Sequence, residues 1–239
     1  SQGATPMSIT LYDLCGQDDR RFSPFCWRTK YALAHKGLAF ETVPVSFSAI
    51  NTIGDGSFKT VPVIEDNGTW VGDSWEIAKY LDKAYPDKPA LFPSPEVEAL
   101  CHFVETWQFS NVLRQAFPAY VHDIYLHVKE EDRTYFKESR EKQLGGTKLE
   151  SLVETREEKL PGLRSALFPL RMTLGNQRWL SGDTPGYADY LILSTFLWLG
   201  SVATLPVLEK DDPLLVWLEK GRDLYDGLGR TSPCNEIAA

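Results

Sequence analysis

The chain has 239 residues, of which 43% are hydrophobic and 24% charged, as is usual for a globular protein with a buried core. Its formal net charge of −8 argues against nucleic-acid binding, which needs a basic surface. No stretch approaches the roughly 18 apolar residues of a membrane helix, and residues 1–7 lack the basic and apolar regions of a secretory signal. Four widely separated cysteines suit a reducing compartment. We therefore expect a cytoplasmic protein that binds neither membranes nor nucleic acid.

Residues 8–85 alternate between strand and helix signals. Strands are expected over residues 9–12 and 40–45. Between them, Ser23 is a good N-cap and Pro24 fits a first helical turn, which predicts a helix that ends at a left-handed Gly37. A hairpin around Asn67-Gly68 and a helix over residues 75–84 follow. The order β-α-β, then β-β-α, predicts a thioredoxin-like α/β domain.

The proline-rich segment 86–95 reads as a linker. Beyond it, apolar residues recur at helical spacing and no convincing strand is found. The expected helices cover residues 96–113, 119–128, 133–158, 163–174, 187–203 and 214–225. Residues 96–230 are therefore predicted to form a second, all-α domain.

The strongest local signal lies at residues 23–28, where a helix is expected to begin. A helix N-terminus presents unpaired N–H groups and a partial positive charge, which stabilise a nearby thiolate. Ser23 offers a hydroxyl there instead of a thiol. It cannot form a mixed disulfide, but it can donate a hydrogen bond to a thiolate that a ligand supplies. The alternative is that Ser23 only caps the helix. Cys26, one turn further on, is expected to be a buried structural thiol.

Two further signals follow in chain order. Pro62 begins a strand, which is uncommon because proline cannot donate to the ladder. In a thioredoxin-like fold, a cis proline here turns Val61 outward to pair with an extended peptide; an edge strand is the alternative. Asp73 and Ser74 precede a helix. They can bind an ammonium and a carboxylate group, although helix capping alone would explain them.

Together these segments resemble the N-terminal domain of the cytosolic glutathione transferases. The likeness rests on residues 23–26, 61–62 and 73–74. Residues 182–189 match part of the family's helical-domain signature. Gly186 stands where the family has Ser or Thr, so the capping box with Asp189 is incomplete.

The resemblance implies glutathione as the co-substrate and no metal. Ser23 would be the catalytic residue that hydrogen-bonds the glutathione sulfur. The glutathione-binding residues would be Lys59 for the glycyl carboxylate, Val61 with Pro62 for the cysteinyl backbone, and Asp73 with Ser74 for the γ-glutamyl end.

A narrower likeness extends to the bacterial lignin β-etherases and the etherase-like glutathione transferases of wood-decaying fungi. It rests on residues 23–33, 73–75, 144–146 and 225–230. This likeness implies that thiolytic cleavage of β-aryl ethers is a possible activity beside simple conjugation.

The family's acceptor site lies between the catalytic helix and the first helices of the second domain. An aromatic content of 12% suits planar ligands, although each aromatic residue is individually more often a core residue. The candidate substrate-binding residues are Phe25, Trp107, Phe109, Asn111, Phe117, Tyr120 and Tyr125. The four histidines show no metal-ligand spacing.

The leading functional hypothesis is a glutathione transferase that attacks hydrophobic aromatic electrophiles. A ligandin-type carrier of aromatic compounds and a noncatalytic transferase-like scaffold are the alternatives. Dimerisation is expected by analogy with the family.

Overall fold

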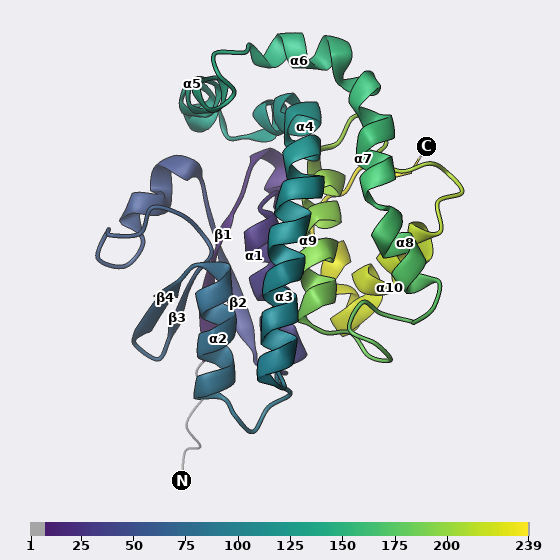
Figure 1. Cartoon of the computed structure of the whole chain (residues 1–239). Helices are drawn as coiled ribbons and strands as arrows, with labels where there is room; N and C mark the ends of the chain where they lie inside the picture. The colour runs from purple at the N-terminus through teal and green to yellow at the C-terminus, as the bar shows by residue number, and fades with distance from the viewer. Residues whose placement is uncertain (1–7, 239) are drawn as a thin grey trace.

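The first part of the chain forms a four-stranded mixed sheet, as seen in the computed structural model, which describes residues 8–238 (Figure 1). Its strands are β1 (Ile9–Leu14), β2 (Phe40–Val45), β3 (Val63–Asp66) and β4 (Thr69–Gly72), in the order β2-β1-β3-β4. β1 is parallel to β2 and antiparallel to β3, and β3 is antiparallel to β4. This arrangement confirms the thioredoxin-like domain. The segment 1–7, considered above for a signal sequence, lies outside the described residues.

Helix α1 (Pro24–His35) begins and ends where the sequence predicts. The Ser23 Oγ accepts a hydrogen bond from the Cys26 N–H at 3.1 Å, and Pro24 occupies the first turn. Gly37 has a φ of +69°, a conformation that glycine adopts without steric cost. The second helix of this domain is α2 (Ser74–Ala84), and two short 3₁₀ segments, η1 (Gln17–Asp19) and η2 (Phe47–Thr52), lie in the loops.

The second part of the chain is helical, as expected. Its α-helices are α3 (Pro95–Gln108), α4 (Arg114–His127), α5 (Arg133–Gln143), α6 (Leu149–Thr155), α7 (Leu160–Ala166), α8 (Phe168–Leu174), α9 (Tyr187–Val202) and α10 (Leu214–Gly227). Short helical segments η3 (Phe109–Leu113), η4 (Glu130–Asp132), η5 (Arg156–Lys159) and η6 (Leu228–Arg230) join or extend them.

Two expected helix boundaries were wrong. The break expected between residues 113 and 119 is absent, because α3 continues through the π-helical η3 into α4 with Pro118 inside the helix. The single helix expected over residues 133–158 is interrupted. Gly145 and Gly146 have φ values of +70° and +87° there, so α5 ends and α6 starts afresh.

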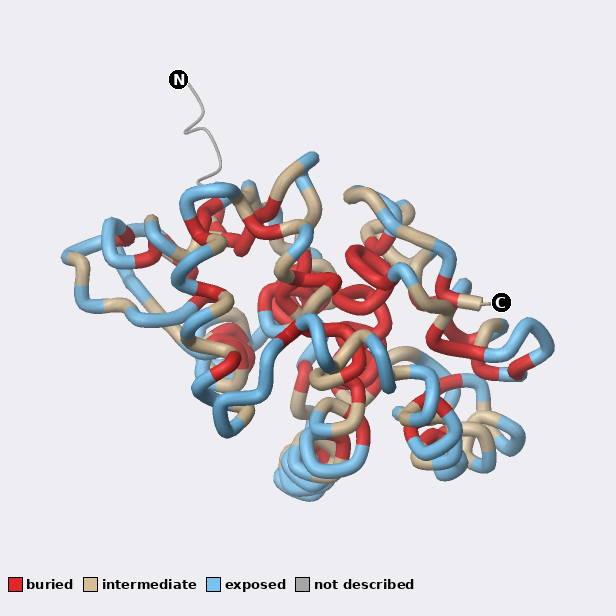
Figure 2. Tube along the Cα trace, turned by 90° about the horizontal axis from the view of Figure 1, so that it is seen from above, coloured by how far each residue is buried: buried red, intermediate tan, exposed pale blue. Residues whose placement is uncertain are grey.

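The core centres on α9, which is buried along nearly its whole length and packs against α1 and α3. Figure 2 shows the buried stretches gathered in the middle of the molecule, with exposed loops around them. In this way α1 is held between the sheet and the helical domain. Across residues 8–238, no helix is long and apolar enough to span a bilayer.

The N-terminus of α9 is held by one buried carboxylate. Asp189 accepts hydrogen bonds from the backbone N–H groups of Leu180, Ser181 and Gly186 and from the indole N–H of Trp217, at 2.7–3.1 Å. Gly186 has no side chain to return a bond, so only half of a capping box is present, as the sequence indicated. The carboxylate thereby joins the loop before α9 to α10.

Candidate functional site

The sheet register brings two of the predicted glutathione-binding segments, residues 61–62 and 73–74, to the same end of the sheet. Tyr12 pairs with Val63, and Val63 pairs with Gly72, so these residues form a row across β1, β3 and β4. One step beyond this row, Pro62 and Asp73 lie next to each other at the end of the sheet where β1 leads toward α1. The sheet therefore gathers segments that lie far apart in the sequence.

Ser23 lies at the N-terminus of α1, three residues before Cys26, whose Sγ is 4.0 Å from the carbonyl of Tyr12 in this row. It is nearly buried, with 5% of its surface exposed. Its oxygen accepts the N–H of Cys26, which leaves the hydroxyl proton for donation to another group. Helix polarity and an O–H donor thus coincide at one point, which is the arrangement that stabilises a thiolate.

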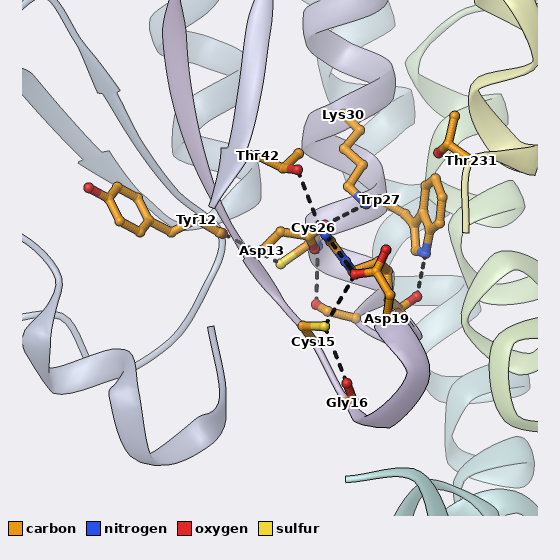
Figure 3. Close-up of polar contacts among 12 residues, drawn as sticks. Tyr12, Asp13, Cys15, Gly16, Asp19, Cys26, Trp27, Lys30, Thr42 and Thr231 are labelled. Carbon is orange, nitrogen blue, oxygen red and sulfur yellow. Dashed lines mark hydrogen bonds and ion pairs between the residues drawn. The ribbon is translucent and has the colours of Figure 1, made fainter. Parts of the chain in front are cut away.

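A buried ion-pair network fixes the loop that leads to Ser23 (Figure 3). Asp13 of β1 is fully buried and binds both Lys30, at 2.5 Å, and Arg21, at 2.7 Å. The Lys30 ammonium lies 3.9 Å from the ring centroid of Trp27, whose indole N–H donates to the Arg21 carbonyl at 2.8 Å. These contacts join β1, the loop and α1, so the start of the helix is set by buried groups.

The native thiols near this edge are unsuited to nucleophilic chemistry. Cys26 is fully buried, and its Sγ lies 4.0 Å from the Tyr12 carbonyl (Figure 3). Burial raises the pKa of the Cys26 thiol to about 12, and burial also raises the pKa of the Cys15 thiol. Both therefore stay protonated at neutral pH, which agrees with the structural role expected of Cys26.

The peptide bond between Val61 and Pro62 is cis, as the sequence predicted. Both residues are buried directly before β3. Lys59 lies two residues earlier in an exposed loop.

Asp73 and Ser74 lie at the N-terminus of α2. The Asp73 carboxylate accepts the Glu76 N–H at 3.1 Å and is the N-cap. Asp73 has a φ of +72°, a conformation uncommon for residues other than glycine, and it is exposed. Ser74 is buried. Capping therefore does occur here, and the exposed carboxylate also faces solvent at the sheet edge.

A pocket of about 460 Å³ lies between α1 and the α3–η3 helix. Its residues are Phe25, Arg28, Glu105, Thr106, Gln108, Phe109, Ser110 and Leu113. The Arg28 guanidinium is buried, pairs with Glu105 at 3.2 Å and lies 4.8 Å from the Phe25 ring centroid. Burial raises the pKa of the Glu105 carboxyl and lowers that of the Arg28 guanidinium.

The predicted acceptor residues are distributed unevenly around this pocket. Phe25 lines it, as does Phe109. Asn111 is exposed and donates its amide to the Trp107 carbonyl at 2.9 Å. Phe117 and Trp107 are half-buried against the core.

Tyr120 lies in the core. It is fully buried, and its hydroxyl donates to the Leu205 carbonyl at 3.0 Å.

Sequence reasoning missed Arg28, Glu105 and Gln108, because charged and amide residues on a helix ordinarily lie on its solvated face. In the part of the chain that the structure describes, no group of three or more acidic, His or Cys side chains is placed to hold a metal ion.

Comparison with known proteins identifies two matched regions. Residues 22–84 match the family described as glutathione S-transferase, N-terminal domain, and residues 99–210 match the glutathione S-transferase C-terminal domain. The chain is 27% identical to glutathione S-transferase omega-1 of Rattus norvegicus over 201 residues, covering 83% of this chain and 72% of that protein.

Two fungal crystal structures are also similar. A glutathione S-transferase of Ceriporiopsis subvermispora, solved in complex with glutathione, is 26% identical with a TM-score of 0.75, covering 94% of each chain. A glutathione transferase of Phanerochaete chrysosporium is 28% identical with a TM-score of 0.75, covering 93% of each chain.

Proposed function

Because this chain belongs to the glutathione S-transferase superfamily, we propose that it is an enzyme in which Ser23 activates the thiol of glutathione for attack on hydrophobic aromatic electrophiles. The observation that carries the proposal is the position of the Ser23 hydroxyl at the N-terminus of α1. The neighbouring end of the sheet also carries residues 61–62 and 73–74, whose chemistry suits the rest of the tripeptide.

Each end of glutathione has a partner of suitable chemistry. The backbone of Val61, before the cis proline, would pair with the cysteinyl unit. The Asp73 carboxylate would accept the γ-glutamyl ammonium, and Ser74 with the N-terminus of α2 would bind its carboxylate. Lys59 would bind the glycyl carboxylate.

The chemical step is a nucleophilic substitution. The glutathione thiol loses its proton to solvent, and the helix N-terminus and the Ser23 O–H stabilise the thiolate. The sulfur then forms a bond to an electrophilic carbon, and the leaving group departs with the electron pair. Substitutive conjugation and β-aryl ether thiolysis share this step and differ in the leaving group. Conjugation to an isothiocyanate is instead an addition, in which the sulfur bonds to the central carbon, the C=N electron pair moves to nitrogen and the nitrogen takes a proton from solvent. Turnover of a fluorogenic β-aryl ether, compared with an aromatic isothiocyanate, decides between them.

We expect Asp73→Ala to raise the KM for glutathione at least tenfold and to change kcat little, because a charge-assisted hydrogen bond contributes about 1.5–3 kcal/mol. The substitution also removes an N-cap, which costs about 1 kcal/mol of stability. Steady-state kinetics with varied glutathione measures the first effect.

Asp132→Ala is the matched control for the loss of a capping carboxylate. Asp132 is a buried aspartate that accepts the N–H groups of Phe47 and Ser48, at 2.8 and 3.0 Å. The Asp132→Ala substitution should lower the melting temperature and leave the KM for glutathione unchanged. An unchanged KM in Asp73→Ala would remove Asp73 from the γ-glutamyl site.

A ligandin-type carrier of aromatic compounds is the second candidate function. The exposed rings of Phe25 and Phe109 at the mouth of the 460 Å³ pocket favour it. Micromolar binding of polyphenols, with no turnover of either test substrate, would support carriage in place of catalysis.

We also propose that the chain forms a homodimer through α3. Leu100 and Phe103 lie on one face of this helix and are 66% and 65% exposed, an unusual exposure for neighbouring large apolar residues. Light scattering should give twice the chain mass, and Phe103→Glu should reduce it to the monomer mass. A monomeric native protein would refute this proposal.

A further inference from the structure

The pocket between α1 and α3 contains two buried polar atoms that lack partners. Across residues 8–238, the Arg28 Nη2 and the Gln108 Nε2 make no hydrogen bond, although both side chains are at most 1% exposed. A buried N–H without an acceptor costs about 1–3 kcal/mol. Both residues line the same pocket, so one occupant can satisfy both.

Neighbouring residues of α9 hold these two side chains in place. The Arg28 Nε donates to the Ser194 Oγ at 3.3 Å, and the Thr195 hydroxyl donates to the Gln108 Oε1 at 2.8 Å. Helix α9 therefore fixes the side chains of both Arg28 and Gln108, which line one pocket. Each keeps one donor nitrogen unused: the Nη2 of the guanidinium and the Nε2 of the amide.

The charge in the pocket selects among possible occupants. Glu105 already neutralises Arg28 at 3.2 Å, so a ligand carboxylate would meet one cation together with a second carboxylate. A neutral acceptor oxygen avoids that repulsion, and a carbonyl oxygen has two lone pairs for two donors. The remaining lining is largely apolar and includes Phe25, Phe109 and Leu113, which suits an aromatic ring.

We propose that this pocket binds a neutral aromatic carbonyl compound, whose oxygen accepts hydrogen bonds from Arg28 and Gln108. This inference rests on the proposed function, for which it names the acceptor class. The Phe25 ring covers the Arg28 guanidinium at 4.8 Å and is 40% exposed. Phe25 therefore turns aside when the ligand enters, a rotation that an exposed side chain makes quickly.

The test compares three naphthalenes by calorimetric titration without glutathione: 2-acetonaphthone, 2-ethylnaphthalene and 2-naphthoate. We expect the ketone to bind at least tenfold more tightly than the hydrocarbon of similar shape and more tightly than the anion. Gln108→Met and Arg28→Lys should each reduce the preference for the ketone to about threefold. Gln143→Met, on the exposed side of α5, should leave it unchanged.

Three results would overturn the inference: equal affinity of the native protein for ketone and hydrocarbon, tighter binding of 2-naphthoate, or displacement of the ketone by glutathione alone. The ligand series on the native protein decides the question even where a variant fails to fold. Since the assay needs no turnover, it is separate from the role of Ser23. If the proposed function is wrong, Ser23→Ala will leave the turnover unchanged, while the native protein still binds the ketone more tightly than the hydrocarbon.

Discussion

Ser23→Ala is expected to lower glutathione-dependent turnover about 100-fold or more, because removal of one donor that stabilises a developing or bound anion costs about 10²–10³ in rate. The loss should appear mainly in kcat. Without the Ser23 O–H, the pKa of bound glutathione should rise, so that less thiolate is present at neutral pH. The thiolate absorbance of the binary complex, titrated against pH, measures this directly.

Ser94→Ala is the matched control for Ser23→Ala. Ser94 caps α3 as Ser23 caps α1, with its side chain accepting the Val97 N–H at 3.2 Å. Both substitutions should cost about 1 kcal/mol of stability, and only Ser23→Ala should raise the thiol pKa. If the two variants have the same turnover, Ser23 is only a helix cap and the enzymatic proposal fails.

Asp189→Ala is expected to destabilise the fold by about 4 kcal/mol or more, because four donors lose their acceptor in a buried site. Asp189 is fully buried and binds the N–H groups of Leu180, Ser181, Gly186 and Trp217. For a chain of this length, such a loss lowers the melting temperature by about 10 °C. Calorimetry or thermal circular dichroism measures it.

Two further variants test whether the loss of stability comes from the buried Asp189 carboxylate. Asp183→Ala removes an exposed carboxylate from the same loop and should change stability by less than about 0.5 kcal/mol. Asp189→Asn keeps one acceptor oxygen and should fall between the two. A melting temperature of Asp189→Ala equal to that of the native protein would show that the loop before α9 repacks without its carboxylate.

Local signals predicted the elements that position the candidate site. The cap at Ser23 and the left-handed Gly37 each follow from the conformational preference of one residue. The cis bond before Pro62 was expected only from the likeness to the thioredoxin-like fold, because an X–Pro bond is ordinarily trans. The boundary missed near Pro118 shows the limit of such signals. Proline ordinarily ends a helix, whereas α3, η3 and α4 here follow one another without a break and α4 contains Pro118.

The pocket was only partly predictable for a similar reason. Phe25 and Phe109 were found because aromatic residues near the catalytic helix suggest a ligand surface. Arg28 and Gln108 were missed because their burial depends on Ser194 and Thr195 of α9, which lie 166 and 87 residues further along the chain. Glu105 was missed because its partner is Arg28. Contacts between segments far apart in the sequence determine which polar side chains are buried away from water.

The anchoring of α1 also determines how the two parts of the chain respond to cleavage. Arg28 contacts Glu105 and Ser194, and the Tyr31 hydroxyl donates to the Gly221 carbonyl at 2.8 Å. A protease that cut the exposed proline-rich segment 86–90 would leave these buried contacts intact. The two fragments would stay together as a nicked complex, and neither part would be stable alone, because separation would expose the Arg28 charge and the apolar faces of α1 and α9.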